Sequence, residues 1–280
     1  MYFGENFMSE IFSRATVNNG ILEVTVNNWL EFLEFSTFFS DSMGKVYFRG
    51  QRDSSWQLTT TLDRFSGTLD SRIAGTYDTI LNIFIKAIRG KTKSIKELVN
   101  NEDEIWALGQ HNGLATPLLD WTSAIFIALF FAFEEKKPSS TGLRAIWGLH
   151  YFIHERMELF NKDKDKYSEF KFVDLITDYN SRLLSQSGVF TKQPLNFDVE
   201  KWVAEQFYNE NERPAMFKIF IPDTERERIL KSLFMMDINH STIYPDLIGA
   251  SKLCMSQLEM MSHTSSQKNL LELLDHVSYK

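Results

Sequence analysis

The pattern of apolar and polar positions along the chain predicts helices and strands that do not alternate regularly. Asn27 and Asn28 precede the apolar run 29–33, which is typical of a capped amphipathic helix. Runs rich in aromatic and β-branched residues predict strands at 46–48, 144–153, 189–191 and 216–221. Helices are expected at 71–89, 94–110, 124–135, 224–233 and after Pro245. We therefore expect an α+β fold, with a small mixed sheet flanked by helices.

One segment, residues 107–123, carries more polar chemistry than its apolar surroundings explain. It contains an amide, an imidazole, hydroxyls, a carboxylate and an indole, carried by Gln110, His111, Thr116, Asp120, Trp121, Thr122 and Ser123. Burying such groups costs free energy unless each one has a partner. The segment therefore indicates either a ligand site or a specific polar network.

An arginine at the end of a predicted strand is a second candidate. Arg49 follows Val46, Tyr47 and Phe48, and Gly50 after it permits a turn or the close approach of a ligand. A guanidinium in this place can bind a phosphate or a carboxylate with two parallel hydrogen bonds. Alternatively, Arg49 pairs with a buried acid and acts as a structural clamp.

The composition is that of a globular protein without a membrane span. A chain of 280 residues, 43% hydrophobic, can form one large domain or a domain with a helical extension. We expect an irregular segment at 1–24, a main domain at 25–250 and a helical extension at 251–280. No apolar run approaches the roughly 20 residues that a membrane helix needs, and the N-terminus does not resemble a secretory signal.

The cysteine count, the histidine spacing and the net charge bear on the cellular compartment, on metal binding and on nucleic-acid binding. The single Cys254 fits a reducing cytoplasm, and the six histidines show no metal-ligand spacing, so no metal is expected. A net charge of −7 argues against broad, non-specific binding to nucleic acid. The one positive cluster, around Lys86 to Lys96, is best interpreted as a solvated helix end.

Three motifs together resemble the FRG domain family. They are Phe48-Arg49-Gly50, then Gln110-His111-Asn112-Gly113-Leu114-Ala115-Thr116 running into Leu118-Leu119-Asp120-Trp121-Thr122, and a weaker match at residues 182–190. The resemblance covers about residues 25–250. The family usually has an arginine after the threonine, where this chain has Pro117.

The order of these elements also resembles the ADP-ribosyltransferase superfamily of the Arg-Ser-Glu type. This resemblance implies an ADP-ribosyltransferase-like core that uses NAD as substrate and no metal. The NAD-binding residues would be Arg49, Gly50, Gln51, Gln110, Thr116, Trp121, Thr122 and Ser123. The catalytic residues would be Asp120, His111 and Gln186.

The superfamily's catalytic glutamate falls on Gly188, so another acid must supply the negative charge near the ribose. Asp120 is the nearest substitute by motif, and His111 can act as a general base because an imidazole titrates near neutral pH. Trp121 can stack on nicotinamide or adenine. Each residue also has a structural interpretation: Asp120 as a helix cap, Trp121 as core, and His111 as a satisfied buried histidine.

Two functions are carried forward. The favoured one is an NAD-dependent ADP-ribosyltransferase that modifies a nucleic acid or a protein, as a bacterial toxin or anti-phage defence effector held by an antitoxin or other regulatory protein. The alternative is a non-catalytic module that senses a nucleotide or nucleic acid, which the loss of the glutamate favours. The sequence has no P-loop, no Gly-x-Gly-x-x-Gly and no Gly-x-Ser-x-Gly pattern, so NTPase, Rossmann and α/β-hydrolase chemistry have no support.

Overall fold

A single mixed β-sheet organises the protein. The computed structural model describes residues 10–42, 45–66, 76–91, 101–153, 170–173, 175, 185–194, 196–207 and 214–262. The strands follow the order β1-β2-β8-β5-β3-β4-β7-β6, with β2 and β8 parallel and the other neighbours antiparallel. Their bounds are β1 Thr16–Asn18, β2 Ile21–Thr25, β3 Val46–Gln51, β4 Leu118–Thr122, β5 Leu143–His150, β6 Lys171–Val173, β7 Gly188–Lys192 and β8 Met216–Pro222.

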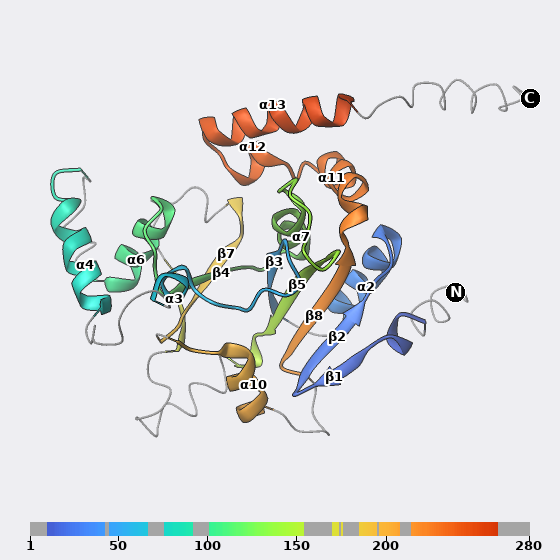
Figure 1. The fold of residues 1–280 in the computed structure, drawn as a ribbon, viewed down its shortest axis with the longest axis horizontal. Helices are drawn as coiled ribbons and strands as arrows, with labels where there is room; N and C mark the ends of the chain where they lie inside the picture. The colour runs from blue at the N-terminus through green and yellow to red at the C-terminus, as the bar shows by residue number, and fades with distance from the viewer. Residues whose placement is uncertain are drawn as a thin grey trace, which may run out of the picture.

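Helices cover both faces of this sheet (Figure 1). Their bounds are α2 Trp29–Ser42, α3 Thr61–Ser66, α4 Thr76–Ala87, α6 Glu102–His111, α7 Ile125–Phe133, α10 Val199–Phe207, η1 Asp223–Glu225, α11 Arg226–Met235, α12 His240–Ile243 and α13 Leu247–Ser262. The expected mixed α+β fold is confirmed. Among the described residues, no helix is long and apolar enough to cross a membrane.

Strand alternation divides the core into two sides. On β3, Phe48 packs with α2, α7 and α11, whereas Tyr47 packs on the opposite face with α10. On β4, Leu118 packs under α4 and α6, whereas Leu119 and Trp121 join the α10 side. Helices α7 and α6 therefore lie on the same face, over neighbouring parts of the sheet.

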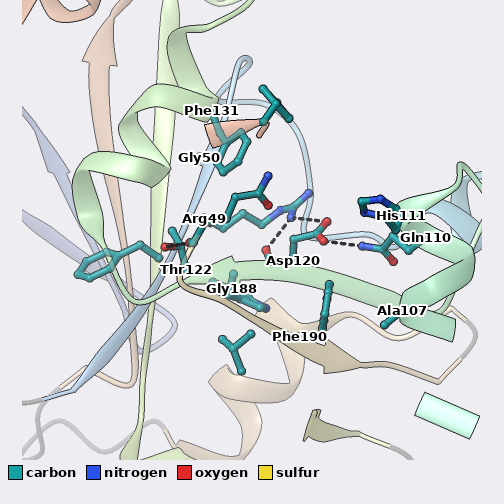
Figure 2. A pocket seen from close by; sticks show the side chains of 15 residues that line it. Arg49, Gly50, Ala107, Gln110, His111, Asp120, Thr122, Phe131, Gly188 and Phe190 are labelled. Atoms are coloured by element: carbon teal, nitrogen blue, oxygen red, sulfur yellow. Dashed lines mark hydrogen bonds and ion pairs between the residues drawn. The ribbon is translucent and has the colours of Figure 1, made fainter. Parts of the chain in front are cut away.

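The sheet is nearly divided between β3 and β4. These two strands share one paired position, Phe48 with Thr122, whereas β3 pairs with β5 from Val46 to Gln51. Beyond this junction the pairing stops, and Arg49 and Asp120 face each other across the gap (Figure 2). The polar side chains of Arg49 and Asp120, which the sequence marked as candidates, therefore lie at this gap.

Gly50 is required for packing against α7. A Cβ atom added at position 50 would lie 1.9 Å from the carbonyl oxygen of Ala128. Any side chain there would push α7 away from β3, so the close approach that Gly50 permits is that of a helix backbone rather than of a ligand.

Several sequence predictions need correction. The segment 1–24 was expected to be irregular, but its described part contains β1 and most of β2, and β2 pairs with β8. Short or exposed strands such as β1 give a weak hydrophobic pattern. No strand was predicted at 118–122, but this stretch forms β4, in which every residue except Asp120 is buried. The first part of the helix predicted at 94–110 and the first part of the motif match at 182–190 lie outside the described residues.

Candidate functional site

A cleft of about 380 Å³ opens where β3 and β4 stop pairing. Its volume falls within the range of small-molecule sites. Figure 2 shows the side chains converging from β3, β4, α6 and the start of β7. The lining residues are Phe48, Arg49, Gly50, Ala107, Gln110, His111, Asp120, Trp121, Thr122, Phe131, Gln186, Gly188, Val189, Phe190 and Tyr244.

Arg49 occupies the centre of the cleft. Its Nη1 donates to the main-chain carbonyl of Asp120 at 2.7 Å and lies 3.7 Å from Asp120 Oδ2. Its buried Nε–H meets no hydrogen-bond acceptor among the described residues. The Arg49 side chain lines the cleft and is 20% exposed, so its guanidinium can meet an anionic ligand there.

The charge of Arg49 is maintained despite its position. Burial lowers the pKa of its guanidinium, Asp120 raises it, and the nearby positive charge of Arg64 lowers it. Because an arginine side chain stays protonated in proteins, the group remains charged at neutral pH. Two cations near one cleft produce a potential that favours anions.

Asp120 projects into the cleft beside Arg49, with 60% of its side chain exposed. Its Oδ1 accepts a 2.5 Å hydrogen bond from Gln110 Nε2. Gln110 Oε1 in turn accepts from the hydroxyl of Thr116, which is fully buried. The carboxylate is therefore oriented by a neutral donor, and its negative charge remains available to a ligand.

His111 closes α6 at the same end of the cleft. It is solvent-exposed and lines the cleft with Gln110 (Figure 2). The interpretation of His111 as a buried histidine is thus wrong. An exposed imidazole beside a carboxylate is compatible with general base chemistry.

Thr122 and Gln186 line the opposite end, but their roles differ from those expected. The Thr122 hydroxyl donates to the carbonyl of Gln186 at 2.7 Å and accepts from the N–H of Ala124 at 3.1 Å. Thr122 therefore connects the turn before β7 to the start of α7. The Gln186 amide Nε2 donates to the carbonyl of Ile243 at 3.2 Å, and this bond orients its Oε1. Gln186 lies in a turn, one residue before Ser187 with a φ of +46°.

Three expected binding residues have structural roles instead, and a fourth lies outside the cleft lining. Trp121 borders the cleft but is only 3% exposed, and its indole N–H donates to Thr191 on the other face of β4, so it is core. Gln51 is buried between the carbonyl of Gln57 and the indole of Trp147. Thr116 supports Gln110, and Ser123 is exposed outside the cleft lining. Strand alternation after Asp120 predicts the direction of Trp121, because neighbours on a strand face opposite sides.

Sequence reasoning missed the aromatic wall of the cleft. Phe131 of α7 and Tyr244 after α12 form an edge-to-face pair with ring centroids 6.2 Å apart, and Tyr244 donates its hydroxyl to Glu134 at 2.8 Å. Phe131 has a local signal, since it follows Ala128 by one helical turn, and Ala128 packs on Gly50 beside the cleft. Tyr244 lies 113 positions further along the chain (244 − 131), and no local pattern marks it.

Few acidic side chains line the cleft among the described residues. Gly188 faces Thr122 in the β4–β7 register, which leaves no side chain at the position of the superfamily's glutamate. Among the described residues that line the cleft, Asp120 is the one carboxylate. Within the same part of the chain, no group of three or more His, Cys, Asp or Glu side chains is placed to hold a metal ion.

Comparison with known proteins identifies part of the chain. Residues 44–141 match the model of the FRG domain, a stretch that contains the Phe48-Arg49-Gly50 motif and the polar segment 107–123. No curated protein and no solved structure matches the chain significantly. Gln186, Gly188, Phe190 and Tyr244 line the cleft from outside the matched stretch. Residues 44–141 are thus similar to the FRG domain, and later segments of the chain complete the cleft.

Proposed function

We propose that this protein is an NAD-dependent ADP-ribosyltransferase whose substrate binds in the cleft between β3 and β4. The observation that carries the proposal is the pairing of Arg49 with Asp120. A partly exposed guanidinium lies beside an exposed carboxylate, inside a cleft of ligand size. NAD offers a diphosphate to the first group and a sugar that becomes cationic to the second.

In the proposed reaction the glycosidic bond between the ribose C1′ and the nicotinamide nitrogen breaks. Nicotinamide leaves with the bonding electrons, and positive charge develops on the sugar. The Asp120 carboxylate stabilises that charge electrostatically. The acceptor, a hydroxyl or amine of a nucleic acid or protein, then attacks C1′ and gives its proton to His111.

The aromatic wall supports a planar ring in the same cleft. Phe131 and Tyr244 line the cleft as an edge-to-face pair, and Gln186 lines it with its amide held by the carbonyl of Ile243. A flat carboxamide ring suits such a wall, because stacking and one hydrogen bond fix its orientation. The cleft volume suits one half of a dinucleotide, with the other half extending outward.

The experiment is incubation of the protein with NAD labelled separately in its nicotinamide and adenylate parts. Nicotinamide release, or adenylate label on RNA, DNA or protein from a cell extract, supports the proposal. Asp120→Asn is the matched control, because it retains the shape and the acceptor for Gln110 while removing the charge. Binding of NAD without any release in the presence of extract would refute the transferase.

The second candidate is a non-catalytic nucleotide sensor, and Gly188 is the observation that favours it. A transferase with one exposed carboxylate has a smaller electrostatic contribution to catalysis than one with an additional glutamate. Expression in bacteria separates the two. A toxin or defence effector arrests growth as wild type and not as Asp120→Asn, whereas a sensor is harmless in both forms without its partner.

A further inference from the structure

A relay of hydrogen bonds runs from helix α3 to the carboxylate in the cleft. Thr61, the first residue of α3, accepts from the N–H of Thr116 at 2.9 Å and donates to its carbonyl at 3.2 Å. The N–H of Leu62 also donates to that carbonyl, at 3.1 Å. The main chain of Thr116 is therefore fixed by α3 on both of its polar groups.

The Thr116 hydroxyl can donate in one direction only. Its oxygen accepts from the N–H of Leu118 at 3.3 Å, so its proton is directed to Gln110 Oε1. A donor on this side selects the orientation of the amide. The Gln110 NH₂ group is thus turned toward Asp120, which can only accept when ionised.

We propose that Gln110 and Thr116 are positioning residues that hold the Asp120 carboxylate at the ribose. The kinetic consequence of this proposal rests on the proposed function of the cleft. Gln110 fixes Oδ1 with an uncharged donor, so the carboxylate is held without being neutralised, and Oδ2 remains toward Arg49 and the cleft. A lysine or arginine in place of Gln110 would hold the carboxylate equally well but cancel its charge.

This relay also accounts for the spacing of the polar motif. Gln110 lies in the last turn of α6, Asp120 lies in β4, and Thr116 in the connection between them is linked to Asp120 through the Gln110 amide. Helix α6 and strand β4 also pack together through Leu118, and the amide adds a polar link to that apolar contact. Polar groups linked in series hold one another in place when every member is satisfied.

The kinetic test compares Thr116→Val, which removes the hydroxyl at nearly constant volume, with Thr116→Ser, which retains it. Thr116→Val should lower kcat for nicotinamide release about 10- to 100-fold with little change in KM, because a misplaced catalytic group affects the chemical step. Thr116→Ser should restore kcat to near the wild-type value. Thr191→Val is the matched control, since it removes a fully buried hydroxyl bonded to Trp121 on the other face of β4.

The second measurement needs no enzymatic activity. In the ligand-free protein, the side-chain amide signals of Gln110 in NMR spectra should shift in Asp120→Asn and in Thr116→Val, and stay in place in Thr191→Val. Gln110→Met identifies the signals by removing them.

The outcomes separate the relay from the proposed function. If the NMR signals of the Gln110 side chain do not shift in Asp120→Asn or in Thr116→Val, the relay is refuted, even if the wild type releases nicotinamide. A wild type without any NAD chemistry whose Gln110 signals respond to both changes would refute the transferase and support the relay. An active enzyme in which Thr191→Val reduces kcat as much as Thr116→Val would reduce Thr116 to a purely structural role.

Discussion

Arg49 and Arg144 each lie beside a carboxylate, and they are used in opposite ways. Arg144 of β5 is fully buried, and its guanidinium donates to Asp223 and to the carbonyls of Ala132, Glu135 and Lys137. Arg49 of β3 is one-fifth exposed, makes one hydrogen bond to a carbonyl, and has a buried Nε–H without an acceptor among the described residues. The Arg144 guanidinium thus makes several hydrogen bonds to the protein, whereas the Arg49 guanidinium keeps a donor without an acceptor among the described residues.

The difference shows how a structural arginine is distinguished from a binding one. Arg144, together with Arg226, satisfies the carbonyls at the end of α7, where the helix leaves four such groups without partners. Nothing comparable surrounds Arg49. Of the two interpretations of Arg49 that the sequence left open, a phosphate-binding group therefore fits better than a clamp.

The largest expected effect is on stability, from Arg144→Met. Removing the guanidinium leaves Asp223 without its partner and the end of α7 uncapped, which should cost about 3–5 kcal/mol of unfolding free energy. Thermal unfolding should shift down by about 10 °C. Arg49→Met is the matched variant, and an equal loss of melting temperature in both would remove the distinction.

The next effect is on catalysis, from neutralising the two carboxylates. Asp120→Asn should lower nicotinamide release about 10²- to 10³-fold and leave NAD binding nearly unchanged, because the charge acts mainly in the transition state. Asp223→Asn should do the reverse: it should reduce the melting temperature and retain turnover per folded molecule. Turnover measured on folded protein decides, and a loss in Asp223→Asn would contradict the assignment.

A smaller effect is expected for Arg49→Lys. Lysine retains the charge but not the two-pronged geometry, so NAD affinity measured by calorimetry should fall about 10- to 100-fold. The melting temperature should stay within about 2 °C of wild type, because Arg49 makes one hydrogen bond to the protein. Unchanged affinity would remove Arg49 from the site.

The smallest effect concerns a basic group that the fold keeps neutral. His240 of α12 packs on Phe130 with ring centroids 5.0 Å apart. Burial lowers its pKa to about 4, with Lys252 and Arg226 lowering it and Glu259 raising it. Its contribution to stability is complete above pH 6.5 and is lost as the pH falls toward 4, because the unfolded chain binds the proton first.

His240→Gln provides the measurement for this group. Between pH 7 and pH 5, the wild type should lose about 1–2 kcal/mol more unfolding free energy than the variant. Urea titrations at the two pH values give the difference. Identical losses would show that His240 does not resist protonation in the folded state.

Sequence reasoning succeeded where the determinants are local. The strands around Val46 and Met216 and the helix after Asn28 follow from apolar periodicity and a cap, and Asn28 does accept from the N–H groups of Leu30 and Glu31. The resemblance also assigned Arg49, Gln110, His111, Thr122 and Gln186 to one binding and catalytic site, and all five line one cleft.

The sequence predictions that were wrong or missing concern residues whose surroundings come from distant parts of the chain. Trp121 was expected to stack on a ligand, but strand alternation turns it toward Thr191, which is 70 positions away. Tyr244 enters the cleft because α12 packs on α7 through His240 and Phe130. Position 50 requires glycine because α7 packs directly on it, and the local sequence pattern does not show where α7 packs.

The single paired position between β3 and β4 has a mechanical consequence. Strands β1, β2, β8, β5 and β3 form one hydrogen-bonded block, and β4, β7 and β6 form another. One backbone pair transmits little cooperativity between blocks, so each side of the molecule can exchange its amide protons as a separate unit. A ligand that binds Arg49 of one block and Asp120 of the other would link the two blocks, and they would then unfold as one cooperative unit.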